Sequence, residues 1–126
     1  MPRIALIVED SDAAASTLEV ALARIAGLNS ACVAGGHDAL EYLNGPDGAH
    51  VCAVLTDLNM PGMDGSELIA NMRSADRYRE MPIIVISGSP EPGISAHVLS
   101  LGANAFFSKP FSPAAVCSKL EELLRA

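Results

Sequence analysis

Short apolar runs alternate along the chain with segments in which apolar residues recur every three or four positions. Runs of four to eight apolar residues are typical of strands buried on both faces of a sheet. The intervening spacing is typical of amphipathic helices that cover such a sheet. The expected strands are residues 3 to 8, 30 to 34, 51 to 56, 82 to 86 and 105 to 107.

Turn and capping residues predict where several of the helices begin and end. Gly27 is expected to stop the first helix. Asp64 and Glu67 have the spacing of a capping box, and Ser112 and Pro113 read as an N-cap followed by proline in the first helical position. The expected helices begin after residue 12, span roughly 38 to 43, begin after 64, span 94 to 101, and begin at 113.

Five strands that alternate with five helices, with no hairpin signals, predict a parallel sheet with right-handed crossovers and helices on both faces. The fold class is therefore α/β, doubly wound. The sequence has no internal repeat, low-complexity tract or linker, so a single domain is expected to span residues 1 to 126.

Composition narrows the classes of function that fit this fold. The formal charge of −7 argues against a nucleic-acid surface, and proteins are the expected partners. The apolar residues are spread in short runs that predict no membrane span, and the start of the chain shows no signal peptide, so a cytoplasmic protein is expected. Cys32, Cys52 and Cys117 are far apart and flanked by apolar residues, which suits reduced core thiols.

Polar residues at the strand ends are the candidates for chemistry, because the carboxyl ends of parallel strands meet at one edge of a sheet. Glu9 and Asp10 follow the first strand, Asp57 the third, Ser87 the fourth and Lys109 the fifth. In the common strand order 2-1-3-4-5 the first and third strands are neighbours, so the three acids are expected to crowd together.

Crowded carboxylates of this kind are expected to recruit a cation. Two like charges about 4 Å apart repel by about 4 kcal/mol at an effective dielectric constant near 20. An all-oxygen set of ligands without His or Cys favours Mg²⁺ over zinc. Beside Mg²⁺ and Lys109, Asp57 is suited to attack phosphorus as a nucleophile.

Each of these residues also has a plainer interpretation when it is taken alone. Glu9 and Asp10 could be helix caps, and Lys109 could be a solvated surface lysine. Met60-Pro61-Gly62 is a turn whatever its function, and here it would also aim Asp57. The chain has no Walker loop and no Gly-x-Gly-x-x-Gly, so nucleotide binding has no support.

Taken in order along nearly the whole chain, these motifs resemble the receiver domains of response regulators in two-component signalling, of the chemotaxis-receiver type. The resemblance implies a flavodoxin-like five-stranded sheet in the order 2-1-3-4-5 with five helices. It rests on Glu9-Asp10, the segment Asp57-Leu58-Asn59-Met60-Pro61-Gly62-Met63-Asp64-Gly65, Ser87-Gly88 and Lys109-Pro110-Phe111.

The resemblance also implies roles for individual residues. Asp57 would be the phosphorylation site, and Ser87 and Lys109 would contact the phosphoryl oxygens. The Mg²⁺ ligands would be Glu9, Asp10, Asp57 and the backbone carbonyl of Asn59. Phe106 falls where the family carries its aromatic switch residue.

Three departures from the commoner pattern are Glu9 in place of Asp, Gly88 in place of a small residue such as Ala, and Phe106 without the hydroxyl of a Tyr. None of them removes a ligand or the nucleophile.

The function expected from this resemblance is a signalling switch that catalyses only its own phosphorylation and dephosphorylation. A histidine kinase or histidine phosphotransfer protein would donate the phosphoryl group. A downstream target would bind the face formed by residues 94 to 101, 105 to 107 and the last helix. Two alternatives are an Asp-nucleophile phosphohydrolase, which would be expected to carry an acid where this chain has Asn59, and a binding module that works without phosphate.

Overall fold

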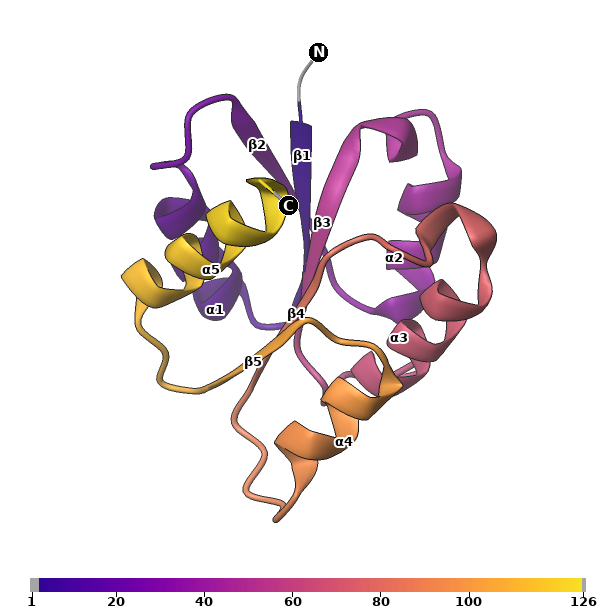
Figure 1. The fold of residues 1–126 in the computed structure, drawn as a ribbon, viewed down its shortest axis with the longest axis vertical. Coiled ribbons are helices and arrows are strands. Elements are labelled where there is room, and N and C mark those ends of the chain that lie inside the picture. Colours follow the sequence, from indigo (N-terminus) through magenta and orange to yellow (C-terminus); the bar gives the residue numbers. More distant parts are fainter. Residues whose placement is uncertain (1–2, 126) are drawn as a thin grey trace.

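Five parallel strands form one sheet in the order β2-β1-β3-β4-β5 in the computed structural model, which describes residues 3 to 125 (Figure 1). The predicted doubly wound α/β fold and its strand order are confirmed. The strands are β1 (Arg3–Val8), β2 (Leu28–Val33), β3 (Val51–Thr56), β4 (Ile83–Ser87) and β5 (Ala105–Ser108). The helices are α1 (Asp12–Leu22), α2 (Gly36–Asn44), α3 (Gly65–Ser74), α4 (Ile94–Leu101) and α5 (Pro113–Arg125), with short 3₁₀ turns η1 (Gly48–His50) and η2 (Asp76–Tyr78).

The sheet is covered on both faces, which explains why its central strands are apolar without alternation. Helices α1 and α5 lie over one face, and α2, α3 and α4 lie over the other (Figure 1). Residues 5 to 8 of β1 are fully buried and point alternately into the two layers of core. The core therefore fixes β1 as an interior strand of the sheet, with β2 and β3 paired on either side.

Capping residues behave as their spacing predicts at two helices. Asp64 accepts the backbone N–H of Glu67 at 2.9 Å, and the Glu67 carboxylate accepts the N–H of Asp64 at 3.3 Å, which completes the capping box of α3. Ser112 accepts the N–H of Ala115 at 3.2 Å ahead of α5. The side-chain caps therefore fix where α3 and α5 begin, after the loops that follow β3 and β5.

The end of α1 differs from the prediction. The helix stops at Leu22 with Ala23 as its C-cap, and Gly27 lies further along in the turn that leads into β2. Gly27 has a left-handed φ of 75°, so it serves the turn and not the helix end. Ile25 is buried under this turn, which explains why its position looked helical.

The three cysteines are free thiols but they differ in burial. Cys117 is buried and Cys52 is half-buried, as expected of core thiols. Cys32 is exposed, so the prediction of a core thiol is wrong there; it lies on β2, an edge strand of the sheet. Among the described residues, no helix is long and apolar enough to cross a membrane.

Candidate functional site

The acids predicted to crowd together lie side by side at the carboxyl edge of the sheet. Backbone pairing continues one residue past the strands, because the N–H of Glu9 donates to Val33 at 2.9 Å and that of Asp57 donates to Val8 at 3.0 Å. Glu9 and Asp57 are therefore fixed in register with each other. One carboxylate oxygen from each of Glu9, Asp10 and Asp57 lies within 4.8 Å of the others.

Lys109 lies far from these acids in the sequence but forms ion pairs with two of them. Its Nζ lies 2.8 Å from Oε1 of Glu9 and 3.0 Å from Oδ2 of Asp57. Its backbone N–H donates to the carbonyl of Ser87 at 3.0 Å, which holds the residue after β5 against the end of β4. Burial lowers the pKa of Lys109, but the two carboxylates outweigh burial and raise the pKa above its ordinary value.

The remaining oxygens of these acids face backbone N–H groups. Oε2 of Glu9 accepts the N–H of Ser11 at 3.1 Å, and Oδ1 of Asp57 accepts that of Leu58 at 2.6 Å. The Glu9 side chain is 3% exposed and that of Asp57 is 11% exposed, whereas Asp10 is exposed to solvent. The site therefore combines the buried, hydrogen-bonded carboxylate of Glu9 with the solvent-exposed carboxylate of Asp10.

The donor set fits a hard divalent cation. Three carboxylates and one ammonium leave two uncompensated negative charges at the edge of the sheet. All the side-chain donors are oxygens, which is the set that Mg²⁺ prefers, and an exposed Asp10 leaves room for the waters that Mg²⁺ keeps. The charge and the donor atoms of these residues therefore suit a divalent metal ion.

The loop after β3 is held close to the acids by Gly65. The N–H of Gly65 donates to the carbonyl of Leu58 at 3.0 Å, and a Cβ at Gly65 would collide with the backbone carbonyl of Asp57. The sequence motif contains Gly65, but sequence reasoning gave it no role. Its place directly after the capping Asp64 is the signal that could have pointed to this close approach.

Asn59, predicted to offer its backbone carbonyl to a metal, lies on the same loop. Its side chain is exposed, and its N–H lies 3.4 Å from Oδ1 of Asp57. The loop therefore carries Asn59 beside Asp57, and the role of its carbonyl stays a prediction.

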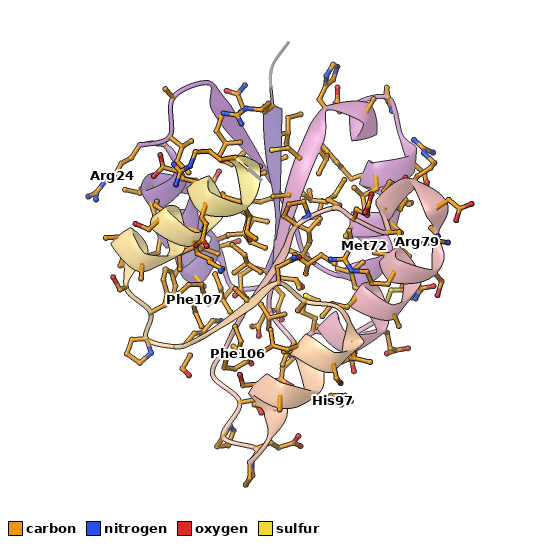
Figure 2. The ribbon with its side chains drawn as sticks, in the orientation of Figure 1. Arg24, Met72, Arg79, His97, Phe106 and Phe107 are labelled. Atoms are coloured by element: carbon orange, nitrogen blue, oxygen red, sulfur yellow. The ribbon has the colours of Figure 1, made fainter. Side chains whose placement is uncertain are left out.

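Ser87 and Phe106 lie on the neighbouring strands β4 and β5. Ser87 is buried at the end of β4, and its Oγ accepts the N–H of Ser89 at 3.1 Å. Phe106 is paired with Val85 and packs on the side of the sheet that α4 covers, whereas Phe107 points to the opposite side (Figure 2). The two predicted switch residues thus belong to one pair of strands, two residues apart in register.

Of two hollows on the surface, one lies away from these acids and the other includes one of them in its lining. One of about 690 Å³ is lined by Cys52, Arg77 and Glu80 among others, near the start of β3 and at the opposite end of the sheet. A smaller one of about 300 Å³ includes Asp10 and His37 in its lining. The chemistry-bearing side chains converge at the strand ends and not in the larger hollow.

Comparisons of this chain with known proteins find relatives among signalling proteins. The family described as "Response regulator receiver domain" matches residues 5–121. The chain is 32% identical over 119 residues to chemotaxis protein CheY1 of Helicobacter pylori, covering 94% of each protein.

Two solved structures extend this likeness. One is the signal receiver domain of a signal transduction histidine kinase from Syntrophus aciditrophicus, with 29% identity, a TM-score of 0.83 and coverage of 98% of this chain and 90% of the other. The other is the phosphorylated cyanobacterial phytochrome response regulator RcpA, with 26% identity, a TM-score of 0.77 and coverage of 99% and 90%.

Proposed function

We propose, from the premise that the chain belongs to the response regulator receiver domains of two-component systems, that Asp57 accepts a phosphoryl group from a phosphohistidine of a partner protein. The observation that carries this proposal is Lys109 set between Glu9 and Asp57, with Asp10 at the open side. A carboxylate flanked by a cation and by further acids is suited to phosphoryl chemistry and poorly suited to binding a neutral ligand.

In the transfer, a carboxylate oxygen of Asp57 forms a bond to phosphorus as the bond from the donor's imidazole nitrogen breaks. The imidazole keeps the electron pair and takes a proton from water. Glu9, Asp10, Asp57 and the carbonyl of Asn59 would hold Mg²⁺, which offsets charge on the phosphoryl oxygens. Lys109 would leave its carboxylate partners in part and pair with a phosphoryl oxygen.

The modification would be read through Ser87 and Phe106. A phosphoryl oxygen would accept a hydrogen bond from Ser87, and Phe106 would fill the space that this movement opens. A charge-assisted hydrogen bond contributes about 1.5 to 3 kcal/mol, whereas shifting a population from 1:99 to 99:1 takes about 5.5 kcal/mol. Ser87 and Lys109 must therefore act together.

The proposed partners follow from this role. A histidine kinase or histidine phosphotransfer protein in the cytoplasm would supply the phosphoryl group, and a target protein would bind the face of α4, β5 and α5. The domain would act on no other substrate. The phosphorylated state named for RcpA, a relative at 26% identity, supports this proposal.

The test is phosphate incorporation from a small phosphodonor such as acetyl phosphate with Mg²⁺. The wild type should take up one base-labile phosphate, Asp57→Asn none, and Asp47→Asn, at an exposed aspartate away from the cluster, as much as the wild type. Full labelling of Asp57→Asn would remove Asp57 from its role. Turnover of unrelated phosphoesters would favour the phosphohydrolase instead.

A further inference from the structure

The guanidinium of Arg73 on α3 joins three segments at the end of the sheet opposite the acids. Its Nε donates to the carbonyl of Gly102 at 3.0 Å, and its two terminal nitrogens donate to the carbonyl of Tyr78 at 2.8 Å and to Oδ1 of Asn104 at 3.1 Å. The side chain is half-buried, and burial lowers its pKa. Arg73 therefore acts as a rigid fork between α3, η2 and the end of α4.

The C-terminal end of α4 is fixed by this fork and by the sheet. Gly102 ends the helix with φ at 117°, and a Cβ there would lie 2.8 Å from Cγ and Nε of Arg73. The N–H of Asn104 donates to the carbonyl of Ile83 at 2.8 Å, and Oδ1 of Asn104 accepts the N–H of Ile83 at 2.8 Å. The segment 102 to 104 is thus bound to both α3 and the first residue of β4.

The N-terminal end of α4 has a weaker anchor, since Ile94 is partly buried against the core but no side chain caps the helix there. It begins after Gly93, which has φ at 78°, gives no side-chain cap, and has no atom within 4 Å of the place where a Cβ would stand. Residues 90 to 93 are exposed. This exposed segment follows residues 88 and 89 and so links α4 to the buried Ser87 at the acid edge of the sheet.

We propose that Arg73 is the fixed pivot of α4, so that a displacement at Ser87 swings the N-terminal turn of the helix while residues 102 to 104 stay in place. The proposal rests on the proposed function, since it says how movement at the phosphorylation site is converted. A helix held at one end and free at the other turns about the held end. The exposed surface around His97, which projects from α4 in Figure 2, would then move more than the surface at the helix end.

The first test needs no variant. Backbone amide chemical shifts are measured in the wild type with and without beryllofluoride and Mg²⁺, a mimic of the phosphoryl group. The shift changes should be large at residues 94 to 97 and should fall along α4, until those at residues 102 to 104 are as small as those in β2. Equal changes along α4, or the largest changes at residues 102 to 104, would overturn the pivot.

The second test compares Arg73→Lys with Arg79→Lys by amide hydrogen exchange in the free protein. Lysine keeps the charge but cannot make the three-way fork. Arg73→Lys should speed exchange at Gly102 to Asn104 by about tenfold or more, since each hydrogen bond from a charged donor contributes about that factor. Arg79, exposed on the surface near η2 (Figure 2), should have no such effect when changed.

The two proposals fail in different ways. Absence of any shift near Asp57 on adding beryllofluoride would contradict the proposed phosphorylation site, and the exchange measurement would then still decide whether Arg73 fixes the end of α4. If Arg73→Lys and Arg79→Lys change exchange at residues 102 to 104 equally, Arg73 holds nothing there and the pivot is wrong.

Discussion

Replacing Lys109 with methionine tests the electrostatics of the acid cluster in the free protein. Methionine is nearly as long as lysine, so it can keep the packing of the Lys109 side chain beside Gly88. The change removes the ammonium that lies 2.8 Å from Glu9 and 3.0 Å from Asp57. Among residues 3 to 125, the Glu9 side chain, only 3% exposed, then keeps a single hydrogen-bond partner, the N–H of Ser11.

The expected loss of unfolding free energy is about 3 kcal/mol. Breaking a buried ion pair by removing one partner costs about 3 to 5 kcal/mol, because a charge is left uncompensated. The lower end applies here, since the Lys109 side chain is 28% exposed and water can take part of its place. Domains of this size have about 5 to 15 kcal/mol of stability, so the variant should still fold.

Urea unfolding followed by far-UV circular dichroism, without Mg²⁺, measures this loss. With a slope of about 1 to 3 kcal/mol per molar urea, the midpoint should fall by roughly 1 to 3 M. In a Glu9→Gln background the same change should cost less than half as much, because one of the two partners is already neutral. A loss below about 1 kcal/mol, or equal losses in both backgrounds, would refute the reasoning.

The same contact predicts a dependence on alkaline pH. The two carboxylates raise the pKa of folded Lys109 above its ordinary value of 10.5, even though burial acts in the other direction. The stabilisation is therefore fully present below pH 10.5 and is lost as the pH rises through the folded pKa. The difference in stability between wild type and Lys109→Met should narrow above that pH, and a constant difference would contradict the assignment.

Three further expectations concern the metal and the packing. Mg²⁺ at a concentration of a hundred times its Kd should add about 2.7 kcal/mol to the free energy of unfolding and so raise the melting temperature. The double variant Glu9→Gln, Asp10→Asn should lose this response in thermal scans. Tyr78→Phe should cost about 1 to 2 kcal/mol in urea unfolding, since its buried hydroxyl contacts two acceptors on α2; a neutral effect would contradict this. Gly65→Ala should push the loop away from Asp57 and weaken Mg²⁺ binding in calorimetry, and unchanged affinity would show that the loop gives way without cost.

The strands could be predicted from sequence because burial on both faces leaves a continuous apolar run, as in β3, whose bounds were found correctly. The start of α2 was harder to place. Gly36 opens that helix although glycine is a poor helix former, because a Cβ there would collide with Met63. A requirement set by a residue 27 positions away leaves no mark on local periodicity.

Strand ends likewise predicted which residues of the candidate site share an edge, but not how they touch. That Lys109 contacts both Glu9 and Asp57, and that Ser11 clamps Glu9, depends on side-chain geometry. Arg73 was missed altogether, because an arginine on an amphipathic helix reads as a solvated charge. Its three acceptors come from segments that only the folded chain brings together.

The excess negative charge at the edge of the sheet also governs how quickly ligands arrive. Two uncompensated charges, with Asp10 exposed among them, lie on a protein of net charge −7. A divalent cation is drawn toward such a field, whereas a small anionic phosphodonor must diffuse against it. At physiological ionic strength the Debye length is about 8 Å, and this screening weakens both effects. A protein donor that presents a cationic surface beside its phosphohistidine would escape this barrier, so under the proposed function encounter rates would favour a docked partner over free metabolites.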